Sequence, residues 1–201
     1  EYNPNGELQR KCEGDPCAAG TTWSYVFDGM GSLRSVTLPN GAAVHYLLDP
    51  LGRRIGRQFL PDGINVDSLR SRYFLYQDSL RIAAEVDEQQ RLVRQYVYLT
   101  RANVPEYFME FGAGGSVTGT YRIVTDLLGS PRVVIDTATK QIIEAMRHDE
   151  WGNLLDHQVY ATAPAGYRTI PFGFAGGLYD EDTWLVHFGA RDYDPEVGRW
   201  I

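Results

Sequence analysis

The chain has 201 residues, 43% of them hydrophobic, which is enough for one domain with its own core or for several stacked repeats. Lysine and arginine number 19 against 26 aspartates and glutamates, and the resulting net charge of −7 argues against nucleic-acid binding through a broad basic surface. No apolar run approaches the ~18 residues of a membrane-spanning helix, and the first residues lack the basic-then-apolar pattern of a secretory signal. Because the chain begins with Glu1 instead of Met, we expect it to be a piece of a longer polypeptide.

A short repeat organises the first part of the chain. Residues 25–31 (YVFDGMG) and 46–52 (YLLDPLG) both read Y-x-x-D-x-x-G, and residues 2–8 (YNPNGEL) resemble a shortened copy. Residues 123–129 (IVTDLLG) and 146–152 (MRHDEWG) keep the Asp and the Gly but lack the Tyr. The 21 glycines and 13 tyrosines of the chain fit a β architecture with many turns.

Each repeat predicts a strand, a tight turn and a second strand. The Asp side chain can accept hydrogen bonds from the backbone that follows it, and the Gly three positions later allows the positive φ that such a turn requires. A single hairpin of this length cannot bury its aromatic face, so its stability is expected to come from stacking on its neighbours. The residues that we assign to these turns are Asp28, Gly31, Asp49, Gly52, Asp126, Gly129, Asp149 and Gly152.

The middle of the chain leaves two interpretations open. Residues 72–99 alternate apolar and polar positions around the polar group at 87–90, which predicts another hairpin. The alanines and glutamates of residues 79–94 keep a helix as the alternative. The glycine-rich residues 111–119 are expected to form a loop or the tip of a long hairpin, and residues 163–171 an irregular connection.

Two small groups of residues are interpreted as structural or peripheral. Arg53, Arg54 and Arg57 form the most basic cluster, and we expect them to lie on a solvated edge beside a turn. Cys12 and Cys17 can form a disulfide or remain free thiols, and they cannot hold a zinc ion alone. The four histidines are dispersed without ligand spacing, so no metal site and no cofactor are predicted.

Residues 172–201 carry the most specific pattern, which resembles the closing segment of the RHS/YD-repeat core. The matching stretches are GGLYDEDTWL and FGARDYDPEVGRW, and LLGSPR at 127–132 resembles a second motif of that family. The chain departs from the family pattern at Trp184, where Gly is usual, and at Asp192, where Tyr is usual. We assign Asp194, Pro195 and Gly198 to the turn of the closing pattern.

The resemblance implies an all-β fold in which YD-repeat β-hairpins form a continuous spiralling sheet, part of a hollow RHS-type shell. We expect two parts: a YD-repeat sheet over residues 1–171 and the closing segment over residues 172–201, which stops short of the family's downstream Asp-Pro motif.

The resemblance also implies a self-cleaving aspartyl protease in the parent protein. Its arginine falls on Arg191, whose supporting role is weighed against an ordinary pairing with Asp194 or local carbonyls, and its two acids would lie beyond Ile201. Because aspartyl proteolysis needs two carboxylates that share one proton, this chain alone is predicted to be inactive. Asp192 and Asp194 are candidate substitutes, but Asp194 before Pro195 fits a turn better.

The predicted function is therefore structural: a shell that encloses and presents a C-terminal polymorphic toxin and supports its autoproteolytic release. The predicted partners are the rest of the same RHS chain and its toxin, with self-association or a secretion machinery as further partners, and no nucleic acid. The predicted location is secreted or on the cell surface after export by a bacterial toxin-delivery system. The alternative is a cell-surface YD-repeat module for adhesion or for protein or carbohydrate interaction.

Overall fold

The structure, a computed structural model, describes residues 1–12 and 20–201, so Cys17 lies outside the described residues. Thirteen strands follow one another as an antiparallel meander, each paired with its neighbours in sequence. A smaller sheet of four strands, β14 to β17, ends the chain. The strands of the large sheet are β1 (Arg10–Cys12), β2 (Thr22–Phe27), β3 (Leu33–Thr37), β4 (Ala43–Leu48), β5 (Arg54–Leu60), β6 (Asp67–Tyr76), β7 (Ile82–Val86), β8 (Leu92–Val97), β9 (Tyr107–Phe111), β10 (Val117–Thr125), β11 (Pro131–Asp136), β12 (Ile142–His148) and β13 (Leu154–Val159).

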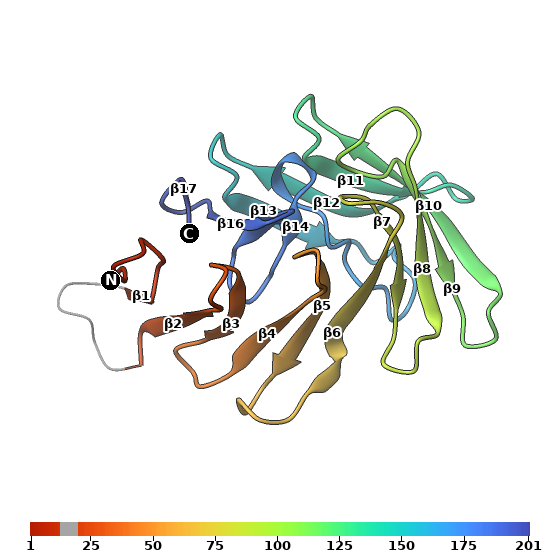
Figure 1. Ribbon diagram of the computed structural model, residues 1–201. Coiled ribbons are helices and arrows are strands. Elements are labelled where there is room, and N and C mark those ends of the chain that lie inside the picture. The colour runs from red at the N-terminus through yellow and green to blue at the C-terminus, as the bar shows by residue number, and fades with distance from the viewer. Residues whose placement is uncertain (13–19) are drawn as a thin grey trace.

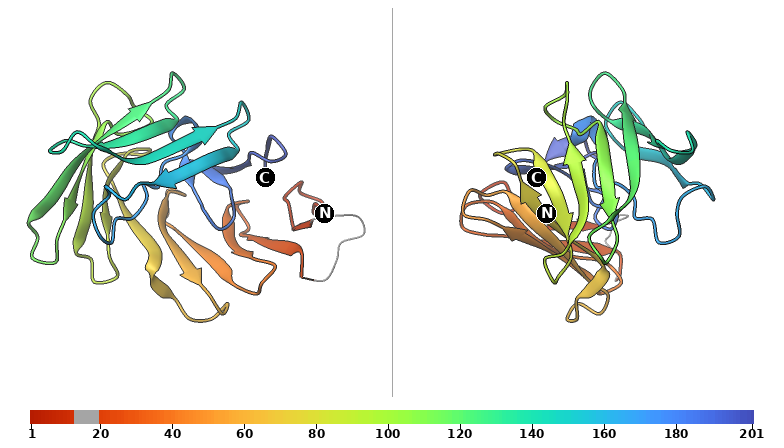
Figure 2. Two further views of the ribbon diagram at one scale, coloured as in Figure 1. Left: turned by 180° about the vertical axis from the view of Figure 1, so that it is seen from behind. Right: turned by 90° about the vertical axis from the view of Figure 1, so that its right-hand side faces the viewer.

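The large sheet curls into an open trough, and the end of the chain lies inside it (Figures 1 and 2). The small sheet consists of β14 (Leu178–Tyr179), β15 (Val186–Phe188), β16 (Arg191–Asp194) and β17 (Arg199–Trp200). The helical content of the described residues is the short 3-10 turn η1 (Phe174–Gly176), so none of their helices is long and apolar enough to cross a membrane. The predicted all-β fold built of hairpins is confirmed.

The repeat turns have the geometry that their residues favour. Asp28 Oδ1 accepts hydrogen bonds from the backbone N–H groups of Met30 (2.9 Å) and Ser32 (3.0 Å), and Gly31 donates its N–H to the Asp28 carbonyl (3.0 Å) at a φ of 78°. The same pattern of bonds recurs around Asp49, Asp126 and Asp149. It is a type I turn followed by a glycine bulge, a common connection of β-hairpins.

Two further turns have this geometry without the full motif. Asn3 takes the place of the Asp in the first turn, where its Oδ1 accepts from the N–H groups of Asn5 and Glu7. Asp87 begins the turn between β7 and β8, and Gln90 occupies the glycine position at a φ of 61°. The hairpin interpretation of residues 72–99 is therefore confirmed, and the alternative helix over residues 79–94 is wrong.

The apolar core lies on the concave side of the trough and includes the end of the chain. The repeat tyrosines Tyr25 and Tyr46 are buried in one cluster, which Leu185 completes. A second cluster lies under β6 to β12 and includes Phe172 and Leu178. Because residues beyond 171 belong to both clusters, the two sheets share their hydrophobic core.

The turn geometry predicts opposite effects for two exchanges at matched positions. We expect Gly52→Ala to lower the free energy of unfolding by about 1–2 kcal/mol, because Ala is disfavoured at the φ of 79°. No steric clash adds to this loss, since a Cβ at this position would meet no atom within 4 Å. Gln90→Gly should raise it by about 1 kcal/mol, since it removes a side chain from the left-handed region. Urea denaturation of both variants measures the difference, and equal signs would contradict the analysis.

Candidate functional site

The candidate site is the part of the concave face of the large sheet that binds residues 172–201, which we call the closing segment. Hydrogen bonds and ion pairs join this segment to strands and turns along the whole sheet. They are Lys11 with Asp194 (2.8 Å), Tyr46 with Asp180 (2.8 Å), Asn103 with the Ala175 carbonyl (2.8 Å), Ser130 with the Ala175 N–H (3.0 Å) and Tyr193 with the Trp151 carbonyl (2.8 Å). The closing segment therefore bridges the two ends of the curled sheet.

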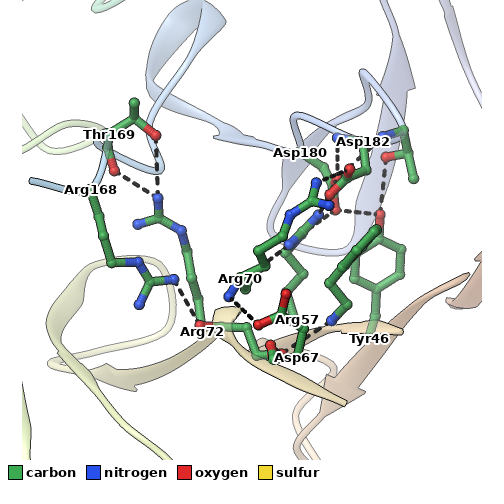
Figure 3. Close-up of polar contacts among 12 residues, drawn as sticks. Tyr46, Arg57, Asp67, Arg70, Arg72, Arg168, Thr169, Asp180 and Asp182 are labelled. Carbon is green, nitrogen blue, oxygen red and sulfur yellow. Dashed lines mark hydrogen bonds and ion pairs between the residues drawn. The ribbon is translucent and has the colours of Figure 1, made fainter. Parts of the chain in front are cut away.

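A buried guanidinium–carboxylate pair holds the start of this segment (Figure 3). Arg57 on β5 donates from Nε and Nη2 to the two carboxylate oxygens of Asp180, at 2.9 and 3.1 Å. Tyr46 and Thr183 complete the cluster around Asp180, and Asp182 pairs with both Arg57 and Arg70. Burial alone would raise the pKa of Asp180, but the charge and hydrogen bonds of Arg57 outweigh it and lower the pKa to about 2.

A second buried pair holds β16. Arg54 donates to Asp192 Oδ1 at 2.8 Å, and His187 Nδ1 lies 3.3 Å from the same oxygen. The Arg54 guanidinium also lies over the ring of Tyr46, 3.6 Å from its centroid. Burial and the neighbouring Arg54 charge lower the pKa of His187, so the neutral imidazole is favoured in this position.

The expected solvated edge at Arg53, Arg54 and Arg57 is therefore wrong for two of the three residues. The side chains of Arg54 and Arg57 are only 3% and 7% exposed, whereas Arg53 stays at the turn, where it pairs with Asp49 at 2.6 Å. The cluster looked like a surface feature because its acidic partners are far away in sequence. Asp180 lies 123 residues after Arg57, and Asp192 lies 138 residues after Arg54.

The irregular connection before the closing segment, residues 163–171, is also held by side chains of the large sheet. Arg72 and Arg94 both donate to the Thr169 carbonyl, at 2.7 and 3.0 Å. The buried carboxylate of Glu144 accepts from the Tyr167 hydroxyl at 2.6 Å and from the Ile170 N–H at 3.2 Å. Backbone groups that no strand could pair are thereby satisfied in the interior.

Strand β16 separates its residues between two faces. Asp192 and Asp194 are buried and face the large sheet, where Asp194 pairs with Lys11 and also accepts from the Glu196 N–H at 3.0 Å. Arg191 is exposed, and its guanidinium carbon lies 5.4 Å from the centroid of the Trp200 ring. The described part of the chain gives Arg191 no ion pair, so the expected alternative of pairing with Asp194 is not found.

The two departures from the family pattern have a structural role. Trp184 adopts a φ of 60°, a conformation that glycine tolerates better, and its ring lies 5.8 Å from that of Trp23 on β2. Asp192 is the partner of the buried Arg54. Both residues thus add contacts between the closing segment and the large sheet.

The remaining turn residues of the closing segment lie together. Asp194 ends β16, Pro195 begins the turn into β17, and Gly198 ends that turn with a φ of 64°. Among residues 1–12 and 20–201, no group of three His, Cys, Asp or Glu side chains is placed to hold a metal ion.

The buried pair predicts a large effect of removing one partner. Arg57→Ala should lower the free energy of unfolding by about 3–5 kcal/mol, because it leaves the Asp180 carboxylate buried without its cation. Arg91→Ala is the matched control, since Arg91 pairs with Asp87 at an exposed turn with 61% of its side chain accessible. We expect the control to cost less than about 1 kcal/mol in the same denaturation experiment. Similar losses in both variants would contradict the assignment.

The low pKa of Asp180 predicts a loss of stability in acid. Because the pKa of Asp180 is about 2 in the folded state and the ordinary pKa of an Asp carboxyl is 3.8, the contribution of Asp180 is complete above about pH 5 and is lost as the pH falls toward 2. Its size is about 2 kcal/mol. The free energy of unfolding, measured by denaturation between pH 6 and pH 2, should fall with decreasing pH in the natural protein and should fall less steeply in Asp180→Asn. An unchanged slope in the variant would assign the acid sensitivity to other carboxylates.

Comparison with known proteins gives a consistent assignment. The family model described as Teneurin YD-shell matches residues 1–201. Double-stranded DNA deaminase toxin A of Burkholderia cenocepacia (strain H111) is 30% identical over 221 residues, which cover 100% of this chain and 15% of that protein. Teneurin-1 of Mus musculus is 28% identical over 200 residues, which cover 100% of this chain and 6% of that protein. The chain thus spans a small part of these relatives.

Solved structures show the same fold. The crystal structure of TcdB2-TccC3 aligns with a TM-score of 0.68 and 18% identity, over 99% of this chain and 10% of that chain. The Photorhabdus luminescens Tc holotoxin pore with a TccC3 mutation aligns with a TM-score of 0.66 and 18% identity, over 99% of this chain and 9% of that chain. At this identity the likeness concerns the fold alone. Together with the closing pattern of residues 172–201, the match over the whole chain identifies this protein as a member of the Teneurin YD-shell family, of the RHS/YD-repeat type.

Proposed function

We propose that this chain is part of a β-shell that encloses a toxin at the C-terminal end of its own polypeptide and supports the autoproteolytic release of that toxin. In this proposal residues 1–171 form the wall of the shell and residues 172–201 close it. The observation that carries the proposal is the seat of the closing segment, which the sheet holds on its concave side by the buried pairs Arg57–Asp180 and Arg54–Asp192.

The end of the closing segment supports the same reading. The Ile201 N–H donates to the Asp192 carbonyl at 2.9 Å, and the Ile201 side chain packs against the cluster that contains Leu185. A polypeptide that continues from this point starts at a fixed position relative to the shell. One relative of the whole chain is named a double-stranded DNA deaminase toxin, which supports a toxin as the enclosed part.

The proteolytic step needs carboxylates other than Asp192 and Asp194. Both are buried and engaged by Arg54 and Lys11, on the face of β16 opposite Arg191. We therefore place the two acids of the protease in the polypeptide that follows Ile201, where one activates a water molecule and the other protonates the leaving amide nitrogen. Arg191 would support this site from the exposed face of β16, and the chain by itself would not cleave.

Location and partners follow from the same proposal. A shell that releases a toxin would be exported by a bacterial toxin-delivery system and would act outside the producing cell. Its partners would be the rest of the same polypeptide and the toxin. The second candidate function is a cell-surface YD-repeat module for adhesion or interaction. Teneurin-1 of Mus musculus, whose name does not describe a toxin, is also similar to this chain over all of its residues and keeps this candidate open. A polypeptide that lacks the Asp-Pro-x-Gly motif after Ile201 would favour this second function.

The proposed release can be tested in the full-length polypeptide with Arg191 and with Arg191→Ala, by intact mass spectrometry. We expect a cleaved toxin fragment in the first and a loss of cleavage of about a hundredfold or more in the second, because the arginine stabilises charge that develops during the reaction. Arg199→Ala, at a neighbouring exposed arginine, is the control and should cleave normally. An uncut product from the natural polypeptide would remove the protease and leave a structural shell.

A further inference from the structure

The exposed face of the small sheet carries a connected group of aromatic rings. Trp200 meets Phe188 edge-on at 5.6 Å between ring centroids and lies 5.5 Å from Tyr193, which in turn stacks on Phe174 at 6.2 Å. The Tyr193 hydroxyl donates to the Trp151 carbonyl at 2.8 Å, so a turn of the large sheet fixes this group. The position of the Trp200 ring is thus determined from two sides.

Arg191 belongs to this face through the register of the strands. Tyr193 pairs with Trp200 across β16 and β17, and Arg191 lies two residues before Tyr193, so Arg191 and Trp200 are diagonal neighbours on one face. The Arg191 guanidinium carbon lies 5.4 Å from the Trp200 centroid, within the ~6 Å range of a cation–π contact. Phe188, the direct cross-strand partner of Arg191, also contacts the Trp200 ring edge-on.

This arrangement differs from that of the structural arginines. Arg54 and Arg57 are buried, and each donates to a carboxylate of the closing segment. Arg191 is exposed, and its guanidinium has an aromatic neighbour but no acidic partner in the described residues. A guanidinium that rests on a ring keeps its in-plane N–H donors free for a carboxylate, which it binds in a two-pronged manner.

We propose that Trp200 is the positioning residue of Arg191: it holds the guanidinium on the exposed face of β16 with its donors free for a carboxylate from outside residues 1–201. This inference rests on the proposed function, in which that carboxylate belongs to the protease. It also assigns a role to the tryptophan that ends the matching stretch FGARDYDPEVGRW. Without Trp200, the long side chain of Arg191 would sample many rotamers and lose the entropy advantage of a fixed donor.

The first test measures cleavage in the full-length polypeptide with Trp200→Phe, Trp200→Leu and Arg191→Lys. We expect Trp200→Leu to slow cleavage about tenfold and Trp200→Phe to slow it less, since Phe keeps an aromatic face. In the Arg191→Lys background, Trp200→Leu should slow cleavage markedly less than in the natural polypeptide, because lysine lacks the planar guanidinium that Trp200 would position. Equal effects of Trp200→Leu in both backgrounds, or none in either, would overturn the positioning role.

The second test does not depend on cleavage and uses the 201-residue chain. In its NMR spectrum the Hδ and Hε protons of Arg191 should be shifted by the ring current of Trp200, and Trp200→Leu should return them to the positions of a free arginine. Arg199, for which the structure gives no aromatic partner among the described residues, is the internal reference. The thermal stability of each variant is measured as a control, because Trp200 also packs against Phe188 and Tyr193 and its loss can destabilise the fold. Unshifted Arg191 protons would refute the inference, whereas shifted protons in an uncut polypeptide would refute only the protease.

Discussion

The structure depends on buried pairs between arginines of the large sheet and aspartates of the closing segment. Arg57 with Asp180 and Arg54 with Asp192 are almost completely excluded from solvent. A charge that is buried without its partner is strongly unfavourable, so an arrangement of the closing segment that buries these arginines must also place the aspartates beside them. This mutual requirement fixes the last thirty residues on the concave side more specifically than apolar packing alone would.

Further contacts of the closing segment explain how an open sheet keeps its curvature. The meander has two ends and is not closed by pairing of β1 with β13. Lys11 beside β16 and Trp151 beside Tyr193 connect both ends of the sheet to the same small sheet. The closing segment thus acts as a brace inside the trough, and the irregular residues before it are held by Arg72, Arg94 and Glu144. Polar groups in this interior carry positional information because each has a defined partner.

The alternation of β16 divides two tasks between neighbouring residues. Asp192 and Asp194 face inward and anchor the strand, whereas Arg191 and Tyr193 lie on its other face, where Arg191 is exposed. Side chains of a strand alternate between its faces, so anchoring and the proposed contact with a further carboxylate can be served by consecutive residues without competition. The inward acids would otherwise neutralise Arg191, and the same strand could not present a free guanidinium.

The sequence by itself determined the features that depend on neighbouring residues. The Asp-x-x-Gly turns follow from side chains that bond the next few backbone groups, and the hairpins follow from alternating strands on both sides of such turns. Gln90 in a glycine position and Trp184 at a positive φ escaped this reasoning, because their conformations are imposed by the surrounding pairing and packing. The closing pattern identified the family but did not reveal what its aspartates bind.

Only the tertiary structure decided which charged residues are buried and which partners they have. Arg54 and Arg57 follow a turn and have the sequence of a solvated edge, yet the curl of the sheet brings them to acids more than a hundred residues away. The position of Arg191 beside Trp200 depends in the same way on the register of three strands. Local chemistry specifies each hairpin, but which side chains meet inside the trough is set by how thirteen hairpin-linked strands curve together, and no short stretch of sequence encodes that curvature.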